Sequence, residues 1–464
     1  MPRYLPHALS FLAGFLSLSQ EILWTRLVAF SFGGIPQAFA FVLATYLLGI
    51  ALGADIGKDL CRRASARGLA GVDLQRALLR HCGWVFVIAA GIDVAGPWLF
   101  ALAHGSAVGS GVAALAMITT ALVKSVLFPI VHQLGAGADT RRLGGGFSKV
   151  YCANILGSTC GPLVTGFYLL DVVSLQTALA LVAASSAVLG ATLLAAIPRA
   201  AGESAPLPES ARASSRRQEA LLRMFTPPAA RATLADGGVV VALAGAALLG
   251  PFNLVETVVE RGLARDPNVA STEVRHLVEN RHGIVHTLVD SARGDIVFGD
   301  GVYDGRVNLD PRTNANRIDR MFYFAAAAQD ARRVLVIGLS AGAWTRLLQG
   351  LPNLERIDAV EINPGYVELI RRYPAVAPLL DDRRIVVHVD DGRRWLKRHP
   401  AERYDLIVMN TSVHWRAYAT NLLSREFLEI ARGHLNPGST TAASSSMSTT
   451  AAAGSSATRP SDTT

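Results

Sequence analysis

The sequence predicts two kinds of structure in one chain: an α-helical membrane bundle of six spans, and an α/β domain built on a parallel sheet. The mean hydropathy of +0.32, with only 17% charged residues, is too high for an ordinary water-soluble protein of 464 residues. Apolar residues are concentrated before residue 198, whereas strand-like and helix-like segments alternate after residue 330. The two halves of the chain are therefore predicted to occupy different solvents.

Six apolar segments are each long enough for the roughly 20 residues that cross a bilayer. They lie at residues 7–31, 36–57, 82–104, 108–134, 150–171 and 174–197. The first segment continues past Val28 without a small-residue cleavage site, which indicates an anchored helix rather than a cleavable signal. Residues 1–197 therefore form the predicted bundle.

Arginine residues mark the loops predicted to face the cytoplasm. The loops after the second and fourth segments are basic, as at Arg62 and Arg141, whereas those after the first, third and fifth contain no Lys or Arg. Both ends of the bundle are therefore predicted to face the cytoplasm of a bacterial-type inner (plasma) membrane. Because many arginines sit in these loops, the net charge of +8 does not indicate a nucleic-acid partner.

A basic linker, rich in Ala, Ser, Pro and Arg, is predicted at residues 198–236. The apolar run at 237–252 is short for a span. It is either a seventh span, which would export the C-terminal half, or an interfacial segment, which would leave that half in the cytosol; its length favours the interfacial position. The four cysteines include no CxxC pair, so the sequence predicts neither disulfides nor a metal site.

The segment Val334–Asn363 predicts a nucleoside-binding unit: a buried strand, a glycine-bearing loop, a helix, and a second strand ending in Glu361. The loop contains Gly338, Ser340 and Gly342. Such a loop presents backbone N–H groups to a ligand, and an acidic side chain about 20 residues later can hold ribose hydroxyls. Joined to Asp391 after the next predicted strand, this spacing favours nucleoside binding over glycines that serve packing alone.

The C-terminal half divides further. Residues 279–330 are predicted to form a small β-rich domain, and residues 331–438 the α/β domain. Residues 439–464 are almost all Ser, Thr and Ala without periodicity, which predicts a disordered tail. Sheets of this type normally continue after the fourth helix, so the late strands are predicted to be missing.

Both halves resemble the membrane-fused spermidine synthase-like family of polyamine aminopropyltransferases. In the C-terminal half the resemblance covers residues 280–438 in order and spacing, including the Asp300–Gly301 turn. In the helical half it is carried by Glu21, Trp24, Arg26, the glycines of 49–57, Asn154, Gly157, Gly161 and Gly166.

The resemblance implies a Rossmann-type, methyltransferase-like fold that transfers an aminopropyl group from decarboxylated S-adenosylmethionine to putrescine. Gly338, Ser340 and Gly342 would then lie near the donor, Glu361 would hold its ribose, and Asp391 would face its adenine. The implied partners are a nucleoside, a polyamine-type substrate and the lipid bilayer, with no metal and no nucleic acid. A homo-oligomer is compatible with this assignment.

The chain departs from the family pattern at the reacting centre. The family loop contains an aspartate where Ala341 stands, and the family's catalytic aspartate matches Asn410. An asparagine cannot accept the proton that the attacking amine must lose. His414, four residues later, is therefore the candidate base.

These departures leave three functions open. The first is the aminopropyltransferase. The second is a methyltransferase that uses S-adenosylmethionine itself, whose carboxylate the less acidic loop at Ser340–Ala341 would accommodate. The third is a catalytically inactive membrane sensor or transport protein.

Three ionisable residues fall within the predicted spans: Glu21, Asp93 and Lys124. Charged side chains inside a membrane are costly and mark a site or a pair. We expect a structural Glu21–Lys124 pair, ahead of a polar pathway for a polyamine or another cation.

Overall fold

The computed structural model describes residues 4–136, 143–198, 253–411 and 419–445. The chain divides into two compact units, residues 1–303 with 367–369 and residues 304–366 with 370–464. The predicted linker, except Pro198, and the apolar run at 237–252 lie outside the described residues.

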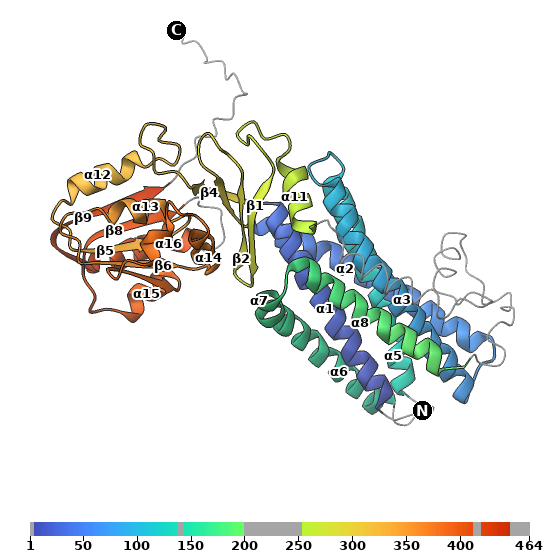
Figure 1. Cartoon of the computed structure of the whole chain (residues 1–464). Coiled ribbons are helices and arrows are strands. Elements are labelled where there is room, and N and C mark those ends of the chain that lie inside the picture. The colour runs from blue at the N-terminus through green and yellow to red at the C-terminus, as the bar shows by residue number, and fades with distance from the viewer. Residues whose placement is uncertain (1–3, 137–142, 199–252, 412–418, 446–464) are drawn as a thin grey trace, which may run out of the picture. The chain divides into compact units, whose positions relative to one another are not determined.

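Every predicted membrane segment is helical, and Figure 1 shows these helices from blue to green. They are α1 (Leu5–Ser31), α2 (Pro36–Ala66), α3 (Gly71–Ala103), α4 (Gly109–Ser125), α5 (Leu127–Ala136), α6 (Leu143–Val164), a π-helical turn (Thr165–Leu169), α7 (Leu170–Val172) and α8 (Leu175–Ala196).

Five helical stretches of the described chain are long and apolar enough to cross a membrane. They are Pro36–Ala66, Gly71–Ala103, Gly109–Gly135, Gly145–Val172 and Leu175–Ala196. Helix α1 is not among them, because Gln20, Glu21 and Arg26 make its second half polar. The number of spans therefore stays a prediction.

Glycine allows the bundle helices to approach at backbone distance. A Cβ atom on Gly53 of α2 would lie 2.0 Å from the carbonyl oxygen of Leu122 in α4, and one on Gly157 of α6 would lie 2.0 Å from that of Phe11 in α1. Small residues at such crossings are typical of helices packed in lipid.

Large apolar side chains face outward from the same bundle. Phe39 and Leu47 on α2 and Leu156 and Phe167 near α6 are each at least half exposed. Outward apolar side chains together with close glycine contacts suit a helix bundle whose surroundings are lipid rather than water.

A small antiparallel sheet belongs to the same unit as the bundle, except for the end of its last strand from Asp304. Helix α11 (Leu254–Leu263) precedes it, and its strands follow the order β1-β2-β3-β4. The strands are β1 (Val274–Asn280), β2 (Gly283–Leu288), β3 (Ile296–Gly299) and β4 (Val302–Arg306). The sheet therefore begins five residues before the predicted boundary at residue 279.

Polar contacts and a shared hydrophobic core join this sheet to the bundle. The Glu279 carboxylate accepts a hydrogen bond from the backbone N–H of Leu175, the first residue of α8, at 2.8 Å. Arg26 of α1 donates to the Asn280 carbonyl at 2.5 Å. The buried side chains of Ile284 and Phe298 belong to the same core cluster as the bundle helices. The small β-domain is thus packed onto one end of the bundle.

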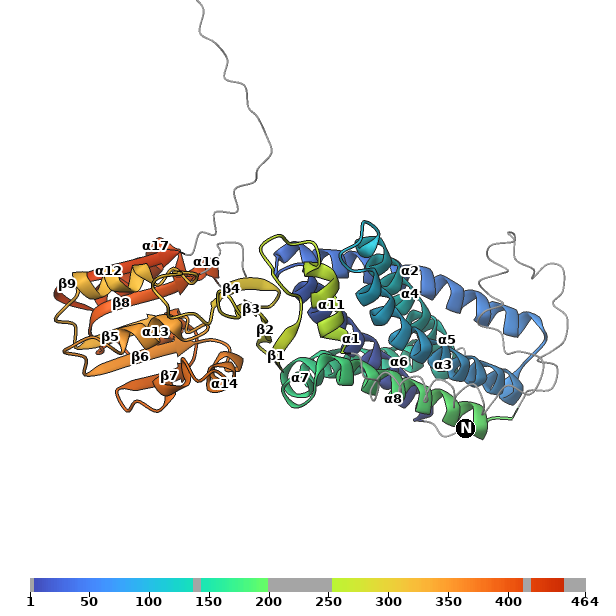
Figure 2. The same cartoon turned by 45° about the horizontal axis from the view of Figure 1, so that its top comes forward.

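The second unit contains a five-stranded sheet in the order β7-β6-β5-β8-β9, in which every neighbouring pair is parallel (Figure 2). Its strands are β5 (Arg333–Ile337), β6 (Arg356–Glu361), β7 (Ile385–Val389), β8 (Tyr404–Thr411) and β9 (Leu435–Ser445). Its helices are α12 (Asp319–Ala327), α13 (Ala343–Leu348), α14 (Gly365–Arg371), a 3-10 turn (Ala377–Leu380), α15 (Gly392–Arg398), α16 (Ala419–Leu422) and α17 (Arg425–Gly433). This confirms the predicted α/β domain with a parallel sheet.

Strand β9 corrects two predictions. Residues 439–445 are not a disordered tail, and the sheet does continue after the fourth helix, because β9 pairs with β8 from Leu406–Thr440 to Thr411–Ser445. An edge strand is held by backbone hydrogen bonds along one side, and β-branched threonines suit it without an apolar pattern. Residues 446–464 lie outside the described residues.

Candidate functional site

The carboxyl ends of four parallel strands meet at one edge of the sheet. Ile337 at the end of β5 is opposite Val360 of β6 and Met409 of β8, and Glu361 is opposite Val389 of β7. Crevices outside the carboxyl ends of parallel strands are the usual ligand sites of α/β sheets.

This edge collects most of the predicted site residues. Gly338 follows β5, Glu361 ends β6, Asp391 follows β7 by two residues, and Asn410 is the next-to-last residue of β8. For Asn410 the structure describes the backbone alone, and His414 lies outside the described residues. The topology therefore places four of the predicted positions together.

The loop after β5 turns sharply through left-handed backbone. Gly338, Ser340 and Gly342 have φ values of +88°, +48° and +75°. A Cβ atom on Gly342 would also lie 2.7 Å from Cδ2 of Leu379, so that side chain would have to shift. Ser340 has a Cβ atom in this region at a cost of about 1 kcal/mol, strain of the kind that clusters at ligand sites.

Glu361 braces this loop from the neighbouring strand. One carboxylate oxygen accepts a hydrogen bond from Leu339 N at 2.8 Å, and the other accepts one from Asn363 N at 2.9 Å. Only 4% of the residue is exposed. Burial raises the pKa of the Glu361 carboxyl, and these N–H donors offset part of the rise. The carboxylate thus fixes the loop geometry in addition to any contact with a ligand.

Asp304, in β4, joins the same loop and was not predicted as a site residue. Its carbonyl oxygen accepts a hydrogen bond from the Ser340 hydroxyl at 2.5 Å, and its carboxylate accepts one from the Tyr366 hydroxyl. Its charge also contributes to the raised pKa of Glu361. No sequence pattern connects Asp304 to Tyr366, 62 residues away, so only the folded chain reveals this second carboxylate.

Asp391 has a structural partner at the same edge. Its carboxylate accepts a hydrogen bond from Arg394 N at 2.8 Å and so caps the first turn of α15. The neighbouring Asp390 forms ion pairs with Arg394 and Arg398. The adenine contact expected of Asp391 stays a prediction.

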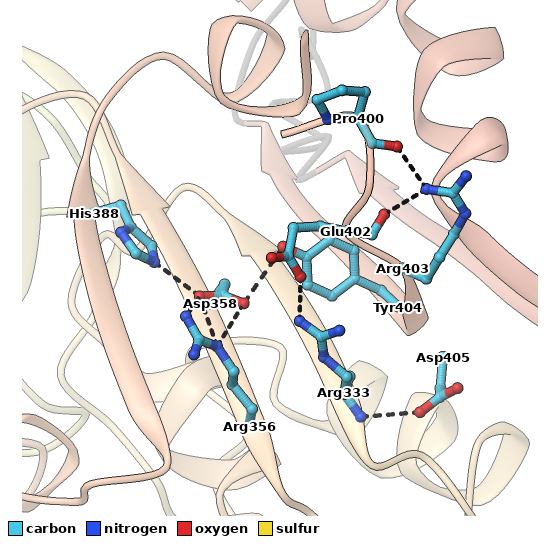
Figure 3. A network of polar contacts seen from close by, with 9 residues as sticks. All are labelled: Arg333, Arg356, Asp358, His388, Pro400, Glu402, Arg403, Tyr404 and Asp405. Atoms are coloured by element: carbon cyan, nitrogen blue, oxygen red, sulfur yellow. Dashed lines mark hydrogen bonds and ion pairs between the residues drawn. The ribbon is translucent and has the colours of Figure 1, made fainter. Parts of the chain in front are cut away.

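A separate polar network centres on Asp358 in the interior of β6 (Figure 3). Arg356 donates to both carboxylate oxygens at 2.8–3.1 Å, His388 Nε2 lies 2.8 Å from one of them, and Tyr404 donates to the other at 3.4 Å. Burial alone would raise the pKa of Asp358, but Arg356 and His388 outweigh burial and hold the pKa below its ordinary value. Since Arg356 and Tyr404 begin their strands, this network starts from the amino ends and has a stabilising role.

The predicted ion pair between Glu21 and Lys124 is wrong in its acidic partner. Lys124 lies 2.8 Å from Asp93 of α3 and donates to the Leu16 carbonyl of α1 at 3.2 Å. Asp93 is fully buried, whereas Glu21 is only partly buried, so the deeper carboxylate has the lysine.

Among the described residues, no group of three or more His, Cys, Asp or Glu side chains is arranged to hold a metal ion.

Comparisons with known proteins agree with this architecture. Residues 321–451 match the spermine/spermidine synthase domain. The polyamine aminopropyltransferase of Agathobacter rectalis is 36% identical over 138 residues, which are 29% of this chain and 43% of that protein. The polyamine aminopropyltransferase 2 of Streptomyces coelicolor is 24% identical over 460 residues, which are 95% of this chain and 73% of that protein.

A crystal structure of spermidine synthase in complex with the transition state analogue AdoDATO aligns with a TM-score of 0.33 and 15% identity, over 37% of this chain and 58% of that chain. The match to the Agathobacter rectalis protein spans less than half of its length. The second relative, by contrast, aligns through the helical half as well as the α/β domain. The domain match and these relatives support a spermidine synthase-like family for this chain.

Proposed function

We propose that the chain is a membrane-anchored aminopropyltransferase that uses decarboxylated S-adenosylmethionine as donor and a polyamine-type amine such as putrescine as acceptor. One observation carries the proposal. The strained loop at Gly338–Gly342 and the buried Glu361 share the carboxyl edge of the parallel sheet, within the region that matches the spermine/spermidine synthase domain.

Glu361 has the capacity to hold a ribose while bracing the loop. A carboxylate offers about four acceptor positions. The backbone N–H groups of Leu339, Ser340 and Asn363 use three of them, the contact from Ser340 being long at 3.4 Å. A ribose hydroxyl would take the remaining position and replace the weak contact.

The transfer itself needs a base. The acceptor nitrogen forms a bond to the methylene carbon beside the donor's sulfonium sulfur, the carbon–sulfur bond breaks, and neutral methylthioadenosine leaves. Before this attack the protonated acceptor amine must lose a proton to expose its lone pair, and Asn410 at the family's aspartate position cannot accept that proton. His414 is the first candidate base. Asp304 is the second, because its backbone carbonyl contacts the loop and its carboxylate accepts a hydrogen bond from the Tyr366 hydroxyl.

The bundle is proposed to anchor this domain in the membrane. Five helices of sufficient length and hydropathy, backbone-distance glycine crossings and outward apolar side chains support that environment. Arginine-rich loops after the second and fourth segments favour a cytoplasmic α/β domain.

The test is a transfer assay on the full chain purified in detergent, with decarboxylated S-adenosylmethionine and putrescine as substrates. We expect spermidine and methylthioadenosine in equal amounts. Glu361→Ala should lower kcat/KM by roughly a hundredfold, the value of a lost charged hydrogen bond. Glu355→Ala is the matched control, because Glu355 is exposed and pairs with Arg332 outside the site.

Asn410→Asp separates a weak enzyme from an inactive one. A restored general base should raise kcat by at least about tenfold and leave KM nearly unchanged. No transfer by either the wild type or Asn410→Asp would contradict the proposal, and a methylated product from S-adenosylmethionine itself would replace it.

A further inference from the structure

A cluster of buried polar side chains lies inside the bundle and has no part in the proposed transfer. Its members share two properties: each is at least nine-tenths buried, and each has a polar atom without a hydrogen-bond partner among the described residues. They are Gln20 and Trp24 of α1, Tyr46 of α2 and Thr120 of α4.

The buried ion pair between Lys124 and Asp93 shows where along the helices this cluster lies. Lys124 of α4 reaches Asp93 of α3 at 2.8 Å and the Leu16 carbonyl of α1 at 3.2 Å. Thr120 is one helical turn before Lys124, and Gln20 is one turn after Leu16. The pair and the unpartnered side chains therefore occupy one layer of α1, α3 and α4.

Helix α2 contributes to the same layer. Tyr46 lies within electrostatic reach of both Asp93 and Glu21. The neighbouring Thr45 hydroxyl contacts the sulfur of Met117 in α4 at 3.8 Å. On the opposite side, Trp24 packs so closely on α3 that a Cβ atom on Gly96 would lie 3.2 Å from its ring. Four helices thus surround the cluster.

Unpartnered polar groups at this depth indicate a missing ligand. A buried donor or acceptor without a partner costs the full free energy of removing that group from water. Four such side chains in one layer would cost a large share of the net stability of a domain. Native structures avoid this by placing water or a ligand among such groups.

The charges of the layer select the kind of ligand. Asp93 and Glu21 are carboxylates. Among the described residues of this layer, Lys124 is the ammonium group, and it pairs with Asp93. The other α1 cation, Arg26, donates to the Asn280 carbonyl at the contact with the small sheet. The described layer therefore contains two carboxylates and one ammonium group.

The chemistry of the unpartnered atoms agrees with a cation. Gln20, Tyr46 and Thr120 each offer an oxygen that accepts hydrogen bonds. The rings of Trp24 and Tyr46 are of the kind that attract organic cations. Lys124 already shows that this layer accommodates an ammonium group beside Asp93.

We propose that α1–α4 form an internal binding site for a monovalent cation, with the protonated amine of a diamine as the occupant that fits these groups. The site is distinct from the proposed donor site, which lies at the edge of the parallel sheet. It does not depend on the transfer reaction.

The test is equilibrium binding to the full chain in lipid nanodiscs, with radiolabelled putrescine in one arm and radioactive sodium in the other. Thr120→Val and Gln20→Leu each remove a polar group at nearly constant volume. Each should weaken binding by about tenfold, the value of one hydrogen bond to a cation. Thr119→Val is the matched control, because the Thr119 hydroxyl is exposed and bonded to the Leu115 carbonyl at 2.7 Å.

The variants separate this site from the proposed donor site. Putrescine binding that Thr120→Val and Gln20→Leu weaken, and that Thr119→Val leaves unchanged, would support an organic ammonium. The same pattern with sodium alone would support an inorganic cation at the site. Binding lost only in Glu361→Ala would overturn the inference while leaving the proposed function intact, and binding that no bundle variant alters would also overturn it.

Discussion

Two buried aspartates in this molecule have opposite surroundings. Asp358 in the α/β domain is hydrogen-bonded by Arg356, His388 and Tyr404, so both of its carboxylate oxygens are satisfied. Asp93 in the bundle has Lys124 as its cation, and the polar side chains around that pair lack partners among the described residues.

The difference separates a stabilising network from a candidate site. A polar network that satisfies all of its members makes the surrounding structure rigid, whereas one that satisfies only some is costly unless something else binds. Burial and charge alone therefore do not identify a ligand site, since both aspartates have them. The unsatisfied neighbours of Asp93 are what point to a ligand.

The largest expected effect comes from removing each carboxylate in turn. Asp93→Asn should lower the free energy of unfolding by about 3–5 kcal/mol, because Lys124, only 4% exposed, is left as a buried unpaired charge. Asp358→Asn should cost less, about 1–3 kcal/mol, because the Arg356 side chain is 45% exposed and can be hydrated. Thermal unfolding of the full chain, with hydrogen exchange to assign each transition, measures both.

A double variant checks the reason for that ranking. Asp93→Asn combined with Lys124→Gln removes both charges, so its cost should be below that of Asp93→Asn alone. A larger cost for the double variant, or a larger loss for Asp358→Asn than for Asp93→Asn, would contradict the comparison.

The next effect concerns a buried histidine at the contact between bundle and small sheet, whose ring nitrogens have no hydrogen-bond partner among the described residues. His286 is stacked on Phe298 with ring centroids 5.0 Å apart, and burial lowers its pKa to about 3 from an ordinary 6.5. Because the folded pKa is depressed, its contribution to stability is complete above pH 6.5 and decreases as the pH falls toward 3. Between pH 8 and pH 5 this loss amounts to about 2 kcal/mol.

His286→Phe should remove that pH dependence and keep the aromatic packing. We expect its unfolding midpoint to exceed that of the wild type, by a margin that widens from pH 8 to pH 5. Parallel pH profiles for the two proteins would show that His286 does not titrate on unfolding.

Two smaller changes in the free energy of unfolding should have opposite signs. Tyr404→Phe removes a hydroxyl that is bonded to Asp358, so it should lower stability by about 1 kcal/mol. Gln20→Leu removes an amide without partners among the described residues, so it should raise the stability of the amine-free chain by about 1 kcal/mol. Thermal unfolding with and without putrescine measures both, and saturating putrescine should cancel the gain of Gln20→Leu because it stabilises the wild type. Two losses of similar size would remove the distinction between the clusters.

Much of this architecture follows from local sequence patterns. Long apolar runs predict all the bundle helices, and the alternation after residue 330 predicts the parallel sheet. The sequence does not predict strand β9, because its Ser, Thr and Ala residues lack the apolar pattern of a buried strand. An edge position does not require that pattern. Strand pairing depends on neighbours that are distant in the chain.

The site was predictable only where the spacing is local. Gly338, Glu361 and Asp391 lie at or just after the ends of successive strands, so parallel topology alone brings them to one edge. Lys124 was assigned to the wrong carboxylate because hydropathy shows which residues lie inside a helix bundle but not which helices are neighbours. The contact of Asp304 with Tyr366 depends in the same way on long-range packing.

The smallest effect tests whether a hydrogen bond stabilises the loop at Ser340, as hydrogen bonds stabilise the network around Asp358. Ser340→Ala loses the hydrogen bond to the Asp304 carbonyl and keeps a Cβ atom at φ +48°, so it should cost about 1 kcal/mol. Ser340→Gly loses the same bond but relieves the left-handed strain, so the two terms should nearly cancel, within about 0.5 kcal/mol. Thermal unfolding of both variants gives the comparison. If Ser340→Gly is as destabilising as Ser340→Ala, the hydroxyl contact rather than backbone strain determines the energy of this loop.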